Sequence, residues 1–158
     1  MILRNARSED AAAVVAWFPD RASAVTWGGP DLPDPLTAAW LAREFARTDR
    51  DYLILEGEPV GPIGVMGLRW HPRAGRAHLI RVGLSPDARG LGLSRVLLKA
   101  AAQIAREQGL RRLTLNVYAD NTPARRAYEA AGFFPSGFDG DVVHMLKPLG
   151  AAEPAQKR

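Results

Sequence analysis

Three stretches in the first half of the chain carry the hydrophobic pattern of β-strands. They are DYLILE (51–56), GPIGVMGLRWH (61–71) and RAHLIRVGL (76–84), each rich in apolar residues and bounded by turn-forming ones. The links between them, GEPV and PRAG, are short turn sequences. Because short links join antiparallel neighbours, the pattern predicts an antiparallel meander over these residues.

Two stretches before this meander repeat their apolar residues with the period of an α-helix. Ser8 is suited to cap a helix that runs to about Trp17, since its side chain can accept a hydrogen bond from a free amide of the first turn. Thr37 is suited in the same way to cap the helix AAWLAREFAR. Between them, residues 18–35 are rich in Pro, Gly and aromatic residues, with room for one short helix.

The second half of the chain predicts two more helices. The longer one has an apolar face made of Leu93, Val96, Leu97, Ala100, Ala101 and Ile104 and ends at Gly109. In the other, Thr122 is the predicted cap, Pro123 the first helical residue and Gly132 the stop.

The segments 1–6, 111–117 and 141–149 read as further strands, so the predicted order is strand, two helices, three strands, helix, strand, helix, strand. This order predicts an α+β fold in which helices flank a mixed, mostly antiparallel central sheet. A chain of 158 residues is about the length of one domain, which we place at 1–150. The polar segment 151–158 is predicted to be a flexible tail.

Composition narrows the function classes. The chain has no cysteine, which excludes disulfides, thiol catalysis and thiolate zinc sites, and its three histidines lack metal-site spacing. The net charge of +4 comes from interspersed charges without a basic arm, so neither nucleic acid nor membrane is an expected partner. No signal peptide or apolar run of membrane-spanning length is present, and we expect a cytoplasmic monomer or homodimer.

The segment RGLGLS (89–94) lies between a predicted strand and a predicted helix. Gly90 and Gly92 lack the Cβ atoms that would keep an anion away from the free amides at the start of that helix, and Arg89 and Arg95 add positive charge. These features favour phosphate binding over a plain turn. The Walker and dinucleotide patterns do not match, because the loop has no GK[ST] and only half of GxGxxG.

What the segment resembles is the acetyl-CoA signature of the Gcn5-related acetyltransferase (GNAT) superfamily. The similarity runs through VGLSPDARGLGLSRVLLKAAAQIA and LNVYADNTPARRAYEAAGF, with matching positions at Pro86, Arg89, Gly92, Asn121, Ala124, Tyr128, Glu129, Gly132 and Phe133. It is strong over about 77–134 and faint over 18–50. Ser94 departs from the usual Gly or Ala but is still small. The resemblance implies the three-layer acyl-CoA N-acyltransferase fold and acetyl-CoA as co-substrate.

The resemblance also implies where acetyl-CoA binds. The pyrophosphate is expected on the amides of Arg89, Gly90, Leu91, Gly92, Leu93 and Ser94. The backbone of Val82, Gly83 and Leu84 is expected to pair with the pantetheine arm, one of its amides polarising the thioester carbonyl. Gly83 also fits a simple bulge. Asn121 is expected either to bind the cofactor or to cap a turn.

Tyr128 matches the tyrosine that protonates the departing thiolate in many members, although a core tyrosine is the alternative. Many members carry a glutamate that acts as the general base at one of two positions. In this chain these positions hold His78 and Asn116. His78 is therefore the candidate base, with a structural histidine or a solvent base as alternatives. Strand alternation would place Arg76, His78, Ile80, Val82 and Leu84 on one face.

The acceptor side is expected in 25–35 and in the helix after Thr37. Trp27 is a candidate lip over the acceptor pocket or a buried structural residue, and Asp31, Asp34 and Glu44 are candidates to attract a cationic amine. The predicted function is transfer of an acetyl group to a primary amine of a small molecule or peptide. The alternative is a catalytically weak module of the same fold that binds or senses acyl-CoA.

Overall fold

The computed structural model describes residues 1–59 and 61–150. The chain forms two compact units, the first from Met1–Arg69 and Leu79–Leu97, the second from Trp70–His78 and the chain from Leu98 onward. The predicted single domain over 1–150 stays a prediction. The predicted flexible tail, 151–158, lies outside the described residues.

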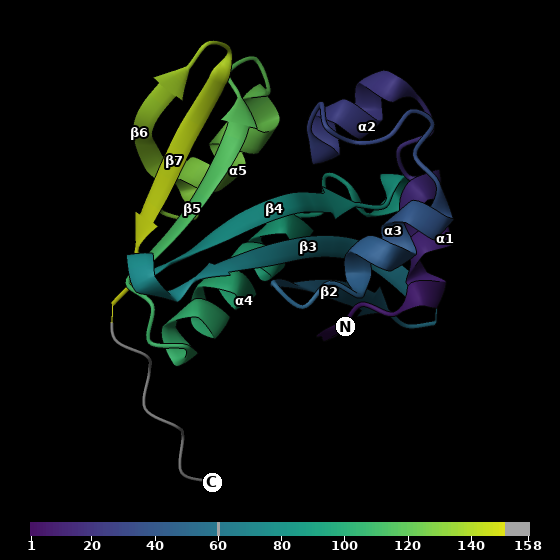
Figure 1. Cartoon of the computed structure of the whole chain (residues 1–158), viewed down its shortest axis with the longest axis horizontal. Helices are drawn as coiled ribbons and strands as arrows, with labels where there is room; N and C mark the ends of the chain where they lie inside the picture. The colour runs from purple at the N-terminus through teal and green to yellow at the C-terminus, as the bar shows by residue number, and fades with distance from the viewer. Residues whose placement is uncertain (60, 151–158) are drawn as a thin grey trace, which may run out of the picture. The chain divides into compact units, whose positions relative to one another are not determined.

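The strands form a seven-stranded sheet with the order β1-β2-β3-β4-β5-β7-β6 (Figure 1). The elements are β1 (Ile2–Asn5), α1 (Ala11–Ala16), α2 (Arg21–Gly28), α3 (Ala38–Phe45), β2 (Arg50–Gly57), β3 (Gly61–His71), β4 (Arg76–Leu84), α4 (Leu93–Glu107), β5 (Arg112–Tyr118), α5 (Thr122–Ala130), β6 (Phe134–Asp139) and β7 (Val142–Pro148). The pairs β1–β2, β2–β3, β5–β7 and β6–β7 are antiparallel. The predicted α+β fold with a mostly antiparallel sheet is confirmed.

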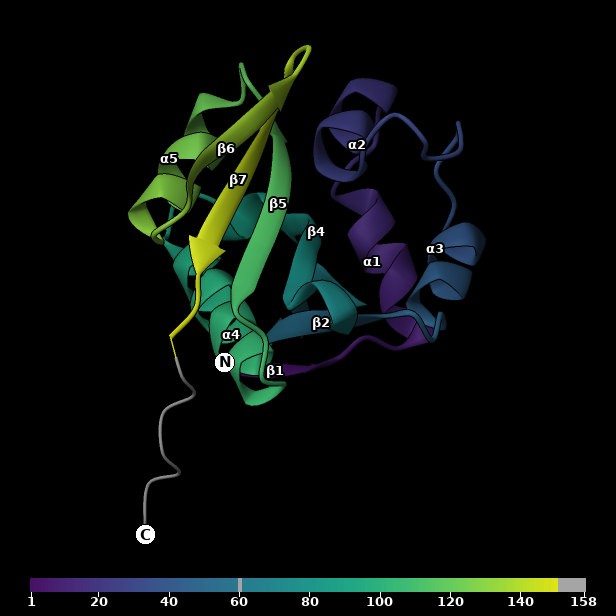
Figure 2. The same cartoon turned by 60° about the vertical axis from the view of Figure 1, so that its left-hand side comes forward.

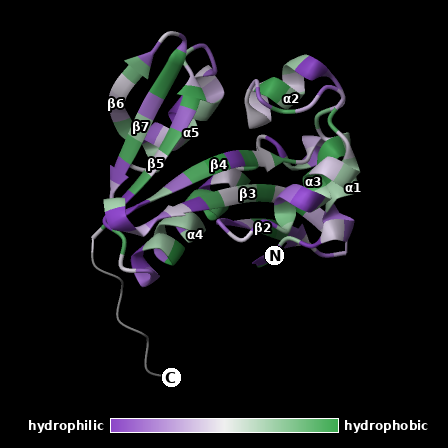
Figure 3. Cartoon of the chain, in the orientation of Figure 1, coloured by the Kyte–Doolittle hydropathy of each residue, from purple (hydrophilic) through white to green (hydrophobic). Residues whose placement is uncertain are grey.

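The core of the first unit lies between the helices α1–α3 and one face of its strands. Register pairs Tyr52 with Gly67 and Ile54 with Val65, so alternate residues of β2 and β3 share this face. The buried cluster there is Ala11, Val14, Trp17, Phe18, Ala24, Trp27, Leu32, Leu41, Tyr52, Ile54 and Val65. Figure 3 shows the hydrophobic residues along β3 that this burial requires. The cluster fixes α2 and α3 against the strands.

Helix caps explain where the first helices begin. Thr37 accepts a hydrogen bond from the amide of Trp40 at 3.1 Å, which confirms the predicted cap of α3. Asp20 caps α2 by accepting from the amide of Ser23 at 2.7 Å. The predicted cap at Ser8 is wrong, because Ser8 is the first residue of a 3-10 turn, Ser8–Asp10, that precedes α1. The side chain that accepts a hydrogen bond here is that of Asp10, from the amide of Arg7.

In the second unit, β5, β7 and β6 lie side by side and α5 runs beside them (Figures 1 and 2). One face of β5 and β7 is buried through Leu113, Leu115, Val117, Val143 and Met145. The opposite face carries Thr114 and Asn116 on β5 and His144 on β7, and it is less buried. This unit therefore presents a polar sheet face.

Three details differ from the sequence predictions. Strand β6 was not predicted, because its residues are mostly exposed and Pro135 and a register shift interrupt its pairing. The cap of α5 is Asn121, one residue earlier than predicted. The buried face of α4 is Leu97, Leu98, Ala101, Ala102 and Ala105, whereas Val96 is 38% exposed. The helix itself carries apolar residues on more than one side. Their spacing therefore fits several faces, and the predicted buried face lies about one residue away from the observed one.

Candidate functional site

The segment that joins β4 to α4 has the backbone conformation of an anion-binding loop. A 3-10 turn over Pro86–Ala88 leads to Gly90 and Gly92, whose φ angles of 76° and 75° lie in the left-handed region. No atom lies within 4 Å of the place that a β-carbon would occupy at either glycine. The glycines therefore serve the backbone conformation and leave open space above the loop.

The amides of this loop are available to a ligand. The amide of Arg95 donates to the carbonyl oxygen of Gly92 at 3.2 Å, whereas no acceptor within the described ranges pairs with the amides from Gly90 to Ser94. They precede a 15-residue helix, α4, whose dipole adds partial positive charge at this end. A phosphate is the ligand that such a group of amides suits best.

Arg89 points back into the first unit. Its Nε donates to the carbonyl oxygen of Leu84 at 3.2 Å and its Nη2 to that of Trp17 at 3.4 Å. Its guanidinium also lies 5.9 Å from the centre of the Phe18 ring. These contacts tie the loop to β4 and α1. The sequence predicts that Arg89 adds positive charge for a phosphate; a direct contact of its guanidinium with a phosphate through these nitrogens would require these hydrogen bonds to break.

Gly83 lies under a pair of stacked aromatic rings. A β-carbon at Gly83 would be 2.8 Å from Phe18 Cζ and 2.9 Å from Trp27 Nε1. The two rings stack with their centres 4.5 Å apart, and Trp27 is only 8% exposed. The structure thus explains Gly83 by the packing of this pair. A contact between Trp27 and an acceptor stays a prediction.

The end of β4 does not alternate as the sequence predicts. Ile80 and Tyr52 lie on the same face of the sheet. Both side chains are next to Gly67, where an added β-carbon would meet them. Arg81 bonds to the Tyr52 hydroxyl on that same face, and its φ of 52° is left-handed. Gly83 then faces Phe18, whereas Leu84 packs against Gly64 on the other face. A bulge at Arg81 has exchanged the faces, so the predicted common face for His78 and Leu84 is wrong.

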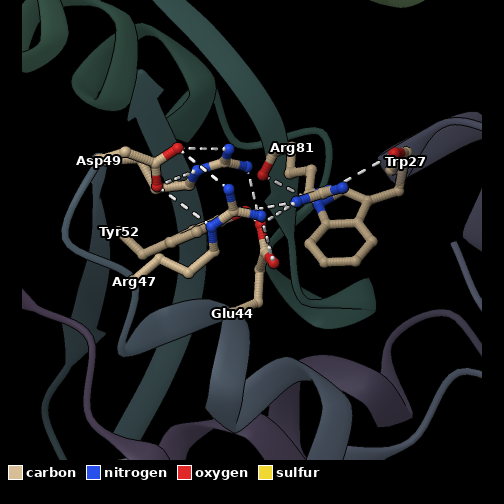
Figure 4. Close-up of polar contacts among 8 residues, drawn as sticks. Trp27, Glu44, Arg47, Asp49, Tyr52 and Arg81 are labelled. Carbon is tan, nitrogen blue, oxygen red and sulfur yellow. Dashed lines mark hydrogen bonds and ion pairs between the residues drawn. The ribbon is translucent and has the colours of Figure 1, made fainter. Parts of the chain in front are cut away.

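An ionic cluster joins α3, β2 and β4 within the first unit (Figure 4). Glu44 Oε1 accepts from Arg50 Nη1 at 2.8 Å, from Arg81 Nη1 at 2.9 Å and from the Tyr52 hydroxyl at 3.1 Å. Its other oxygen lies 3.5 Å from Arg47 Nη1. Burial raises the pKa of Glu44, but Arg81, the Tyr52 hydroxyl and Arg50 together hold that pKa below its usual value.

This cluster changes the interpretation of Glu44. The carboxylate is surrounded by three guanidinium groups and a hydroxyl, and its side chain is 7% exposed. It therefore has no capacity left to attract a cationic amine. Asp31 and Asp34, the other candidates, lie on the surface of the first unit. The sequence could not distinguish these three acids, because the arginines around Glu44 come from distant segments.

In the second unit, two histidines pair with neighbours on the polar sheet face. His78 Nδ1 lies 2.8 Å from Thr114 Oγ1, and His144 Nδ1 lies 2.6 Å from Asn116 Oδ1. Asn116 and His144 are directly opposed in the β5–β7 register. The pairing of His144 was not predicted, because α5 and β6 separate β5 from β7 in the sequence and no short turn sets their register.

Tyr128 lies on α5 of the second unit. Its ring contacts that of Phe133 edge to face, with centres 5.9 Å apart. Burial raises the pKa of Tyr128 to about 12, so its phenol keeps its proton throughout the neutral range. Asn121, the second candidate of this segment, accepts from the amide of Ala124 at 3.4 Å. It serves as a helix cap.

Within residues 1–59 and 61–150, no three His, Cys, Asp or Glu side chains gather in a way that could hold a metal ion. None of the helices in these ranges is both long and apolar enough to cross a membrane.

The sequence relatives of this chain include mycothiol acetyltransferases. Mycothiol acetyltransferase of Rhodococcus opacus (strain B4) is 31% identical over 145 residues, which are 84% of this chain and 42% of that protein. The enzyme of the same name from Corynebacterium glutamicum (strain R) is 32% identical over 140 residues, 83% of this chain and 44% of the relative. The chain thus spans less than half the length of these relatives.

The fold is shared with solved acetyltransferases. PaiA N-acetyltransferase from Thermoplasma acidophilum, in complex with coenzyme A, matches with a TM-score of 0.76 at 21% identity over 93% of this chain and 98% of its own. Spermidine N-acetyltransferase from Vibrio cholerae, in complex with CoA and spermine, also gives 0.76, at 19% identity over 93% and 94%.

The family model described as the acetyltransferase (GNAT) family matches residues 13–133. This range contains the aromatic pair, the bulged strand, the glycine loop and Tyr128. Because the match covers more than half of the chain, the chain belongs to the acetyltransferase (GNAT) family.

Proposed function

We propose that this chain transfers the acetyl group of acetyl-CoA to a primary amine. The observation that carries the proposal is the glycine loop, where unpaired amides from Gly90 to Ser94 precede α4 in a chain of this family. Acetyl-CoA has the pyrophosphate that such a loop suits. The relatives are named mycothiol acetyltransferases, and one of the solved neighbours is a spermidine N-acetyltransferase. These names support the same reaction class.

In the proposed reaction, the amine nitrogen attacks the thioester carbonyl carbon and the carbon–sulfur bond breaks. The backbone of Val82–Leu84 binds the pantetheine arm, and one of its amides stabilises the negative charge that develops on the carbonyl oxygen. The departing thiolate takes a proton from the Tyr128 hydroxyl, which its raised pKa keeps protonated. The proton lost by the amine goes to His78 or to solvent.

The acceptor is proposed as a small-molecule or peptide amine. Because Glu44 is saturated by arginines, this carboxylate gives no preference for polycations. Acceptors that range from polyamines and aminoglycosides to amino acids and peptide N-termini therefore belong in one screen.

Release of free CoA thiol tests the proposal. We expect at least one amine of this screen to give steady thiol release from acetyl-CoA, and the chain adds no thiol background because it has no cysteine. Saturable acetyl-CoA binding without turnover on any acceptor would instead support the sensing module. Absence of acetyl-CoA binding would contradict both.

The role of His78 has its own test. If His78 accepts the amine proton, the rate at limiting amine should rise with pH around the value for an imidazole, about 6.5 when unperturbed. The variant His78→Gln should lose this limb and keep only the titration of the amine. His144→Gln, which changes the other histidine of the same sheet face, is the control. An unchanged profile in His78→Gln would make the histidine structural, with Thr114 as its partner.

A further inference from the structure

Arg81 has an uncommon backbone conformation. It is the one non-glycine residue within the described ranges whose φ is positive, at 52°. The left-handed region crowds the Cβ of ordinary residues, so such a conformation persists only where surrounding contacts hold it. It lies directly before Val82–Leu84, the backbone proposed for the pantetheine arm.

The side chain of Arg81 provides one set of these contacts. Its Nη1 donates to Glu44 on α3 and to the Tyr52 hydroxyl on β2, and its Nε to the carbonyl oxygen of Gly28 at 3.4 Å. The guanidinium also lies 5.5 Å from the centre of the Trp40 ring. Together these contacts draw the side chain onto the face where Ile80 already packs.

The backbone of Arg81 is held from a second direction. Trp27 Nε1 donates to the Arg81 carbonyl oxygen at 2.9 Å, as Figure 4 shows. The same indole stacks on Phe18 and covers Gly83. Helix α2 therefore holds the peptide group after Arg81 through Trp27, while α3 holds the Arg81 side chain through Glu44.

The charge of Glu44 does not by itself require Arg81. Arg50 Nη1 already lies 2.8 Å from Glu44 Oε1, and the Arg50 side chain is 8% exposed against 14% for Arg81. Buried ion pairs are weak evidence of stabilisation and better evidence that a particular arrangement is specified. What Arg81 adds beyond charge compensation is the link between α3 and β4.

We infer that Arg81 is a positioning residue for acetyl-CoA binding, held by Glu44 through its side chain and by Trp27 through its carbonyl oxygen. These three residues form a latch that keeps Val82–Leu84 in the turned conformation that receives the pantetheine arm. The inference rests on the proposed function, since it assigns the latch to that cofactor. Helices α2 and α3, on the expected acceptor side, thereby influence cofactor affinity.

The test compares two arginines that share one carboxylate. Arg81→Met and Arg50→Met each remove one guanidinium from Glu44. Arg81 belongs to β4, however, whereas Arg50 belongs to β2. We expect Arg81→Met to raise the Kd for CoA, measured calorimetrically well below the melting temperature, on the order of tenfold. Arg50→Met should bind as the original chain does, even if it melts earlier. In turnover, Arg81→Met should raise KM for acetyl-CoA more than it lowers kcat.

Two milder variants cover the case in which Arg81→Met does not fold. Trp27→Phe keeps an aromatic ring on Phe18 but deletes the donor to the Arg81 carbonyl oxygen. Arg81→Lys keeps the positive charge but lacks the several nitrogen donors of the guanidinium. The latch requires Trp27→Phe to weaken CoA binding and Arg81→Lys to restore part of what methionine loses. Equal affinities in the Arg81 and Arg50 variants, or unchanged affinity in Trp27→Phe, would overturn it. If the unaltered chain does not bind CoA, the proposed function fails instead.

Discussion

Acetyl-CoA is expected to raise the melting temperature of the unaltered chain and to leave that of Gly92→Glu unchanged. A ligand present at 100 times its Kd stabilises the folded state by about 2.7 kcal/mol. For a chain of this length, that corresponds to roughly 5 to 10 °C. The glutamate would place a negative charge and a side chain in the open space above the unpaired amides, where the pyrophosphate is proposed to bind.

Gly140→Glu is the matched control for this change. Gly140 has a φ of 60°, close to the 75° of Gly92, and a β-carbon there also meets no atom within 4 Å. Both variants therefore carry a similar backbone cost, but Gly140 lies in the turn between β6 and β7. It should keep the full shift with acetyl-CoA. A folded Gly92→Glu chain with the same shift would remove the loop from the cofactor site.

Tyr128→Phe is expected to lower kcat by on the order of 10²-fold or less while the Kd for acetyl-CoA hardly changes. The substitution deletes only the hydroxyl, and no hydrogen bond among the described side chains uses it, so the melting temperature should hold. Because burial raises the pKa of Tyr128 to about 12, the phenol stays protonated as pH rises to near that value. Loss of the acid form should therefore not limit the rate below about pH 11.

Single-turnover rates in the two variants Tyr128→Phe and Tyr118→Phe measure this effect. Tyr118, on β5, loses the same hydroxyl but has no role in the proposed reaction. Its variant should react at the original rate. If the chemical step of Tyr128→Phe were as fast as that of Tyr118→Phe, the contact with Phe133 would be the whole role of Tyr128.

Local chemistry made much of the fold predictable. Turn residues on both sides fixed β3 and β4 at the predicted bounds, and Thr37 marked the start of α3. Where local signals were weak, prediction failed. Strand β6 is an exposed edge without alternation, and its pairing with β7 depends on contacts distant in sequence.

The glycine loop was predictable for the same reason, since the conformation and its free amides follow from glycines at a helix start. The environment of Glu44 was not, because its partners come from β2, β4 and the segment after α3. Nor was the bulge at Arg81, whose left-handed conformation depends on contacts with α2 and α3. Counting residues along β4 consequently assigned Leu84 to the wrong face.

Transfer of an isotopically labelled acetyl group is the most direct measurement of the central claim. The chain, labelled acetyl-CoA and each amine of the screen would be incubated together, and the products analysed by mass spectrometry. We predict label on the nitrogen of at least one acceptor, in amounts equal to the CoA thiol released, and no transfer by Gly92→Glu. Tight binding of acetyl-CoA with label on none of the amines would contradict the assignment of this chain as an N-acetyltransferase.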